Sequence, residues 1–200
     1  MCHAFLADPS FYRFLQQADL VITEEAREAG CPCGGALHYS NYLRKPRGLL
    51  IPRDDDLCLR YSLCCDQDGC RRRCTPPSLR FLGRKIYGSV FIVLITALEH
   101  GLSPRRRKVL TDHFDLAPKT FYRWRHWWRE TFTASSLWRA WRRLLLPPML
   151  AEELPGVLLA RLQGGELKVR LLALLSHLLP LTTGSCASWT MGEVYPQKMG

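Results

Sequence analysis

Several features that would assign a cellular location are missing from this sequence of 200 residues. The N-terminus, MCHAFLADPSFYRFL, has no basic start followed by an apolar stretch and a small-residue cleavage site, so it does not read as a secretory signal. The longest uncharged apolar run, residues 86–98, is shorter than the roughly 20 residues that cross a bilayer. We therefore expect a cytoplasmic protein without a membrane partner.

Catalytic motifs are missing as well. The sequence contains no Walker loop, no G-x-S-x-G, no H-E-x-x-H and no strand-borne G-x-G-x-x-G. A two-metal nuclease needs several carboxylates that converge on Mg²⁺ from an α/β core. The most conspicuous acidic run, Asp54-Asp55-Asp56, lies between Pro52 and Leu57, where a hairpin turn is the better interpretation. We expect no enzymatic activity.

The composition favours a folded protein with a polyanionic partner. Hydrophobic residues make up 47% of the chain, which predicts a genuine core. Lysine and arginine outnumber aspartate and glutamate by 28 to 18, and the formal net charge is +10. Nucleic acid is the commonest partner of so basic a protein.

The order of sequence signals predicts a mainly α-helical fold with a small, β-rich, zinc-ribbon-like module. Asp8-Pro9 and Gly30 delimit a first helix, residues 86–100 read as a buried helix, and Pro76-Pro77 forms a joint between modules. No internal repeat is present. We divide the chain into an N-terminal helix (1–30), a cysteine-rich module (31–75), a helical DNA-binding region (76–134), a Leu-rich helical region (135–181) and a loose tail (182–200).

Nine cysteines are present, and five of them lie between residues 58 and 74. In a cytosolic chain this crowding indicates a metal rather than disulfides. Structural zinc takes four ligands, usually as two pairs on tight turns. The turns C-P-C-G-G and C-C-D-Q-D-G-C predict the ligands Cys31, Cys33, Cys65 and Cys70, with Cys64, Cys74 and His38 as alternates. The other interpretation is a set of reduced, half-buried cysteines without metal.

The segment 104–129 predicts a helix-turn-helix in the middle third of the chain. Ser103-Pro104 begins one helix and Asp115 or Pro118 the next. We expect the two helices to lock together through an apolar face made of Val109, Leu110, Phe114, Leu116, Phe121, Trp124 and Trp128. The opposite face would meet phosphates and base edges. We expect DNA contacts from Arg105, Arg106, Arg107, Lys119, Thr120, Tyr122, Arg123, His126 and Arg129.

Charge is concentrated in the same part of the chain. From Arg105 to Arg143 eleven basic residues stand against three acidic ones. An ordinary helical hairpin with a solvated basic face is the alternative. A second basic run, made of Arg71, Arg72, Arg73, Arg80, Arg84 and Lys85, suits either an extended arm along phosphates or a solvated linker.

Three resemblances add to these patterns. The segment 104–129 is similar to the helix-turn-helix of transposase and resolvase-type proteins of bacterial mobile elements. The phrases CPCGG and RRRCTPPSLRFLGRK, in this order of modules, resemble small accessory proteins and N-terminal DNA-binding regions of bacterial insertion elements. The C-P-C-G turn also resembles a short zinc motif at the end of bacterial protein-export motor proteins. The resemblance to proteins of mobile elements implies duplex DNA binding, with Lys119, Thr120 and Arg123 nearest the bases. It also implies nucleoid association and a transposase as a candidate partner.

Three hypotheses follow from the sequence. The first is a non-catalytic protein that structural Zn²⁺ stabilises and that binds double-stranded DNA, linked to a transposable element. The second is an accessory protein that docks a partner or self-associates through residues 137–181. The third is a binder of single-stranded RNA or DNA, because interleaved aromatic residues and arginines also suit unpaired bases.

Overall fold

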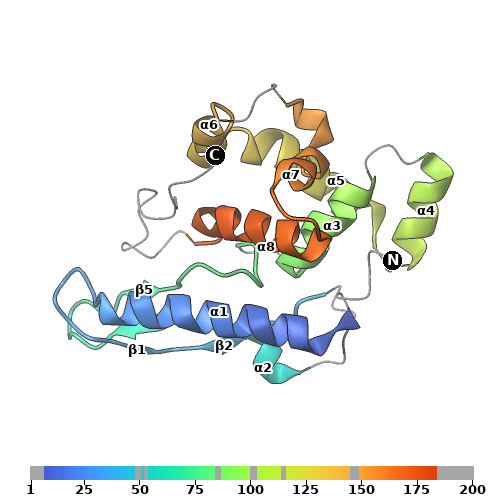
Figure 1. Ribbon diagram of the computed structural model, residues 1–200. Helices are drawn as coiled ribbons and strands as arrows, with labels where there is room; N and C mark the ends of the chain where they lie inside the picture. Colours follow the sequence, from blue (N-terminus) through green and yellow to red (C-terminus); the bar gives the residue numbers. More distant parts are fainter. Residues whose placement is uncertain are drawn as a thin grey trace. The chain divides into compact units, whose positions relative to one another are not determined.

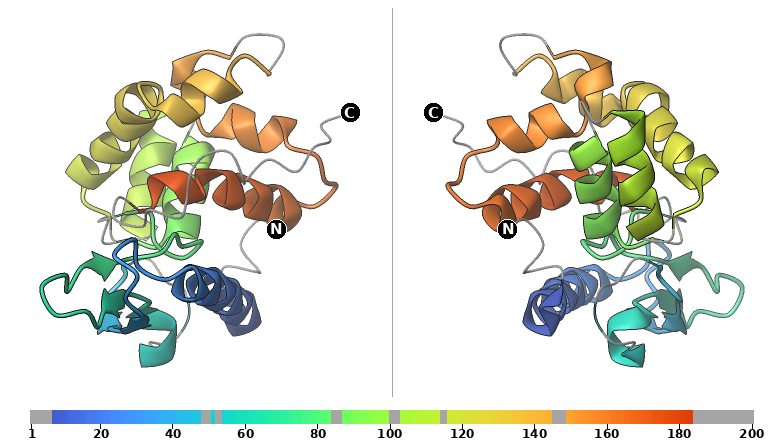
Figure 2. Two further views of the ribbon diagram at one scale, coloured as in Figure 1. Left: turned by 90° about the vertical axis from the view of Figure 1, so that its left-hand side faces the viewer. Right: turned by 90° about the vertical axis from the view of Figure 1, so that its right-hand side faces the viewer.

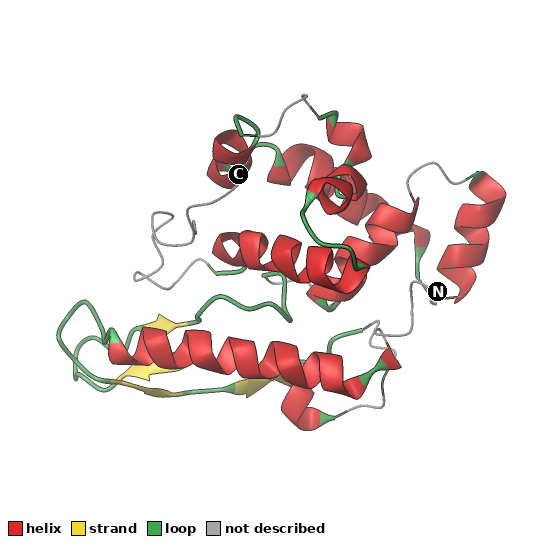
Figure 3. Cartoon of the chain, viewed as in Figure 1, coloured by secondary structure: helices red, strands yellow, loops and turns green. Residues whose placement is uncertain are grey.

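The computed structural model describes residues 7–47, 51, 54–83, 87–99, 103–113, 116–144 and 149–183 (Figure 1). The chain divides into two compact units. Unit 1 comprises Met1–Ser89 and Leu175–Gly200, and unit 2 comprises Val90–Leu174. The described part is mainly α-helical with two small antiparallel sheets (Figure 3), which confirms the expected fold class at that level.

Unit 1 begins with the long helix α1 (Pro9–Glu28). Its start follows the sequence signals, because the carboxylate of Asp8 accepts a hydrogen bond from the Ser10 amide at 2.9 Å and Pro9 occupies the first helical position. After the helix, Gly30 has φ of 72°, a left-handed conformation that glycine adopts at little cost. One face of α1 is buried: Phe11, Tyr12, Leu15, Asp19, Thr23 and Ala26.

Two antiparallel sheets accompany α1 in unit 1. The first has the strand order β1 (Leu37–Tyr39), β4 (Leu63–Cys65) and β5 (Arg73–Cys74), and the second pairs β2 (Tyr42–Leu43) with β3 (Leu59–Arg60). Figure 1 shows α1 running alongside these strands. One side of the first sheet packs with the helix into a core cluster: Ala26, Cys31, Leu37, Leu63, Cys65 and Cys74.

The acidic run forms a helix start and not the expected hairpin turn. Helix α2 (Asp55–Cys58) begins where the Asp54 carboxylate accepts the Asp56 amide at 2.9 Å. Asp55 and Asp56 then lie in the first turn, where negative charge suits the helix dipole. Aspartate is as strong a helix-capping residue as it is a turn residue, so local sequence did not decide between the two.

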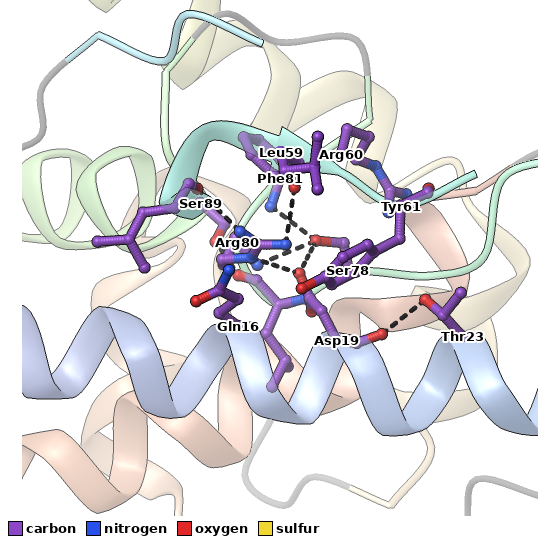
Figure 4. Close-up of polar contacts among 12 residues, drawn as sticks. Gln16, Asp19, Thr23, Leu59, Arg60, Tyr61, Ser78, Arg80, Phe81 and Ser89 are labelled. Atoms are coloured by element: carbon purple, nitrogen blue, oxygen red, sulfur yellow. Dashed lines mark hydrogen bonds and ion pairs between the residues drawn. The ribbon is translucent and has the colours of Figure 1, made fainter. Parts of the chain in front are cut away.

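A buried polar network ties α1 to the segment after β5 (Figure 4). The Asp19 carboxylate accepts hydrogen bonds from the Ser78 hydroxyl at 2.5 Å, from the Leu79 amide at 2.6 Å and from Nε of Arg80 at 2.8 Å. The remaining guanidinium nitrogens of Arg80 donate to the carbonyls of Leu57 and Leu59. Both members of the ion pair are buried, so their charges are compensated inside the unit.

This network corrects two expectations. Arg80 is 5% exposed, so it belongs neither to an arm along phosphates nor to a solvated linker. Pro76 and Pro77 are buried within unit 1, and the division between units follows Ser89 and not the proline pair. Arg84 and Lys85 lie outside the described residues.

Unit 2 is helical (Figure 2). It contains most of α3 (Ser89–Glu99) and then α4 (Pro104–His113), α5 (Pro118–His126), the π-helix η2 (Trp127–Phe132), α6 (Ser136–Trp141), the 3₁₀ turn η3 (Ala151–Glu153) and α7 (Gly156–Arg161). Helix α8 (Leu167–Leu178) runs from unit 2 into unit 1, where the 3₁₀ turn η4 (Leu179–Leu181) follows it.

Aromatic side chains make up much of the core of unit 2. Phe91 meets Trp124 edge to face at a ring distance of 6.0 Å, and Phe132 lies 5.0 Å from Trp128 and 5.3 Å from Trp138. All five rings are buried. Because the residues come from α3, α5, η2 and α6, their packing joins the helices on either side of α5.

The segment after η4 begins inside unit 1 and not as a loose tail. Thr182 is buried, and its hydroxyl accepts the Ser78 amide at 2.9 Å. Residues 184–200 lie outside the described part of the chain. Among the described helices, none is both long enough and apolar enough to cross a membrane.

Candidate metal centre

The first cysteine turn follows directly on the end of α1. The Gly34 amide donates to the Cys31 carbonyl at 2.8 Å, and the Cys31 amide donates to the Gly35 carbonyl at 3.1 Å. Gly34 has φ of 87°, which a side-chain-bearing residue adopts only with strain. These two bonds fold the segment into a tight turn that carries Cys31 and Cys33.

The second turn connects β4 to β5. Its ends are joined by a hydrogen bond from the Cys65 amide to the Arg72 carbonyl at 3.0 Å. Within it, the Cys70 amide donates to the Gln67 carbonyl at 3.0 Å, and Gly69 has φ of 86°. The sheet places this turn beside the first one, since Cys65 is paired with Leu37 of β1.

Asp66 fastens the two turns together. Its carboxylate accepts the Ala36 amide at 3.0 Å, and its own amide donates to the Ala36 carbonyl at 3.1 Å. The turns approach so closely that a Cβ on Gly35 would lie 2.7 Å from Sγ of Cys65. Sequence reasoning gave Gly35 a role only in turn geometry and gave none to Asp66. The chain offered no signal for either contact, because both depend on the pairing of β1 with β4.

The four thiols of these turns come together. The Sγ atoms of Cys31, Cys33, Cys65 and Cys70 all lie within 4.8 Å of one another. Cys31 and Cys70 are 3.8 Å apart between sulfurs, and Cys33 and Cys65 are 3.5 Å apart. Tetrahedral zinc with Zn–S bonds of about 2.3 Å requires sulfurs about 3.8 Å apart. The cluster is therefore close enough to hold a metal ion and is compatible with zinc, and its members are the four ligands that the sequence favoured.

The surroundings of the sulfurs also fit a cation. The Gln67 amide donates to Sγ of Cys65 at 3.4 Å, as amides do at zinc knuckles. The Gly35 amide and the neighbouring thiols lower the pKa of Cys33 to about 7. Loss of hydration on burial raises the pKa of Cys65 to about 12. A bound cation would offset that cost, because a metal holds its thiolate ligands deprotonated.

The three alternate ligands lie outside this cluster. The Cys64 sulfur is 3.7 Å from the Arg71 carbonyl, on the sheet face opposite to Cys65. Cys74 is disulfide-bonded, which departs from the expectation that the clustered cysteines serve metal and not disulfides. His38 is exposed and lies 3.3 Å from the Asp66 carboxylate. No second group of three or more potential ligands comes together in the described ranges.

The predicted helix-turn-helix is reproduced in part. On α5 and η2 the apolar stripe is buried as expected, through Phe121, Trp124 and Trp128, with Leu116 buried before it. Helix α4 differs, because Val109 is 64% exposed and so does not join that stripe. The side chain of Leu110 and all of Phe114 lie outside the described part of the chain.

Four of the predicted contact residues lie on the exposed side of α5. Lys119, Tyr122, Arg123 and His126 are exposed, whereas Thr120 and Arg129 are partly buried. Arg105 of α4 is exposed, and the side chains of Arg106 and Arg107 lie outside the described ones. Residues of opposite character thus occupy opposite faces of α5.

Comparison with protein-family models, with curated proteins and with solved structures found no match to this chain.

Proposed function

We propose that this chain is a non-catalytic protein that binds one structural zinc ion and binds double-stranded DNA through the exposed face of α5. The observation that carries the DNA proposal is the division of α5 into two faces. Phe121 and Trp124 are buried in unit 2, while Lys119 and Arg123 remain exposed. A helix held by its apolar face and basic on the other is suited to the major groove.

Charge supports the same assignment. The described basic residues around α5 outnumber the acidic ones, and Asp112, one of the few acids, forms an ion pair with Lys108 at 3.0 Å. An excess of positive charge on a surface favours contact with phosphates. Zinc would then have a structural role, since four cysteines leave no open coordination position for a reacting water.

The proposal extends to a transposable element. This part rests on the sequence resemblance of residues 104–129 and of the phrase RRRCTPPSLRFLGRK to proteins of bacterial insertion elements. It includes nucleoid association and a transposase as the protein partner. Co-purification of the chain with a transposase encoded beside it is the direct check, and a chain that binds DNA alone and no transposase would remove this extension.

Binding of random-sequence duplex DNA across a series of salt concentrations tests the main proposal. For the native chain we expect the logarithm of the affinity to fall linearly with the logarithm of salt concentration, by about 0.9 per phosphate contact. Replacing Arg123 with Ala should reduce that slope by about one contact. Arg13→Ala removes the same charge from an exposed position on α1 and is the matched control. A flat salt dependence, or equal effects of the two variants, would refute the assignment to α5.

A further inference from the structure

The three-stranded sheet of unit 1 has two different faces. Residues directly opposite one another in antiparallel strands share a face. The pairs Leu37 with Cys65 and Leu63 with Cys74 point into the core against α1. The pairs of Cys64 with His38 and with Arg73 therefore place these three side chains on the other face.

This second face is open and polar. His38 is 68% exposed, Arg73 is exposed, and Cys64 is partly exposed. The chain continues from β1 into β2, where Tyr42 adds an aromatic ring that is 39% exposed. We call the surface made of His38, Tyr42, Cys64 and Arg73 the open sheet face.

Arg73 and Tyr42 are held together on the open sheet face. The guanidinium of Arg73 donates to the Ser40 hydroxyl at 2.8 Å, and its Cζ lies 6.0 Å from the centre of the Tyr42 ring. The two contacts fix a long, flexible side chain beside an aromatic ring. A flat cation next to an exposed ring provides a surface on which a nucleobase can stack without a requirement for sequence.

Positive charge surrounds this pair. Arg71 and Arg72 precede Arg73 and are both exposed. Arg71 forms an ion pair with Asp68 at 2.7 Å, which neutralises one of the three charges. Asp66, the other carboxylate of the turn, is engaged by His38 and by the Ala36 amide. Arg72 lies opposite Cys65 and therefore belongs to the other side of the sheet, which leaves Arg73 as the arginine of the open sheet face.

We propose that the open sheet face binds single-stranded nucleic acid. An unpaired base would stack on Tyr42, and an adjacent phosphate would pair with Arg73. A single strand fits better than a duplex, because stacking on the exposed Tyr42 ring needs a base face that is not already covered by its neighbours in a duplex. This site consists of residues of unit 1 and does not depend on the proposed function.

Fluorescence anisotropy with a labelled oligothymidylate of about 15 nucleotides tests this site on the full, zinc-loaded chain. Tyr42→Ala should weaken binding at least about fivefold, the lower end of the range for stacking on an aromatic side chain. Tyr42→Phe keeps the ring and should bind like the native chain. Arg73→Ala should weaken binding and reduce the salt slope by about 0.7. An oligouridylate and a duplex are the other two probes.

The outcomes separate this site from the one on α5. Tyr42→Ala should leave duplex affinity within twofold of the native value, and Arg123→Ala should lower duplex affinity. Equal binding of the single strand by Tyr42→Ala and the native chain would overturn the proposal, as would parallel losses for single strand and duplex. A preference for oligouridylate over oligothymidylate would identify RNA as the ligand. Because Tyr42 is partly exposed, we expect Tyr42→Ala to keep the native fold. Zinc content and circular dichroism equal to those of the native chain will check this.

Discussion

The cysteine cluster of unit 1 and the helix pair of unit 2 were both predicted from the sequence. The structure agrees with the first prediction fully and with the second only in part. The four favoured cysteines lie within 4.8 Å of one another at their sulfurs. In the helix pair, α5 buries the expected stripe, but Val109 of α4 is 64% exposed. The two regions differ in how much geometry their residues specify.

Chemical specificity accounts for the difference. A tight turn with two cysteines separated by one residue restricts where both thiols point, and a tetrahedral metal accepts only a narrow set of distances. Helical periodicity states only that one stripe is apolar. It does not state which neighbouring element covers that stripe, or whether any element does. The cysteine motif therefore predicts atomic positions, whereas helical periodicity predicts only which face of a helix is buried.

Removing the metal should produce the largest effect. If removal has no effect, the cysteine cluster is not the better predicted of the two regions. Structural zinc contributes about 10–16 kcal/mol of apparent binding free energy in small zinc modules. We expect a chelator to abolish amide protection across residues 31–75 in hydrogen-exchange mass spectrometry, because the core cluster there includes the proposed ligands Cys31 and Cys65, and Cys70 packs against it. Amides of α5 and η2, which carry no ligand, should keep their protection.

Matched cysteine variants control for the chelator. Cys33→Ser should lose the zinc, which inductively coupled plasma mass spectrometry will measure against close to one ion per native chain. Cys64→Ser removes a thiol that lies outside the cluster and should retain the ion. Full zinc content in Cys33→Ser would show that the four-cysteine assignment is wrong.

Breaking the buried ion pair between Asp19 and Arg80 should have the next largest effect. It compares this pair with the exposed pair of Asp68 and Arg71 in the same unit. Asp19→Ala leaves Arg80, whose side chain is 4% exposed, without its carboxylate partner. An uncompensated buried charge costs about 3–5 kcal/mol. Urea denaturation of the zinc-loaded chain measures the loss. Asp68→Ala breaks the exposed Arg71 pair and should change stability little, because water screens that pair. Similar losses for the two variants would show that the network in Figure 4 contributes nothing beyond a surface pair.

That ion pair also marks the limit of prediction from sequence. Asp19 occupies the apolar face of α1 and gave no sign of its partner 61 residues away. Arg80 stood in a basic run, where arginine is normally solvated, and the run itself suggested an arm or a linker. Only the return of the chain after β5 brings the two side chains together. Contacts between residues distant in sequence carry no local signal, so sequence alone misassigned Arg80.

Local signals performed better where they were self-contained. Asp8-Pro9 and Gly30 delimit α1 as expected, since a capping carboxylate, a fixed φ and a left-handed glycine each act within a few residues. The acidic run at Asp54 shows the ambiguity that remains. A carboxylate that accepts an amide two residues later suits both a turn and a helix start, and the structure contains the helix start.

The smallest expected effect concerns Val109 and tests the helix pair directly. If Val109 packed against α5 as the sequence suggested, Val109→Lys would bury a charge and cost several kcal/mol. At 64% exposure the substitution should change the free energy of unfolding by no more than about 0.5 kcal/mol. Lysine is also a better helix former than the β-branched valine, so the small change should favour stability.

Phe121→Ala, at a buried position of α5, is the reference and should cost about 3–5 kcal/mol. Urea denaturation of both variants measures the two values. A large loss in Val109→Lys would place this side chain in the core after all, and the helix pair would then match its sequence pattern as closely as the cysteine cluster does.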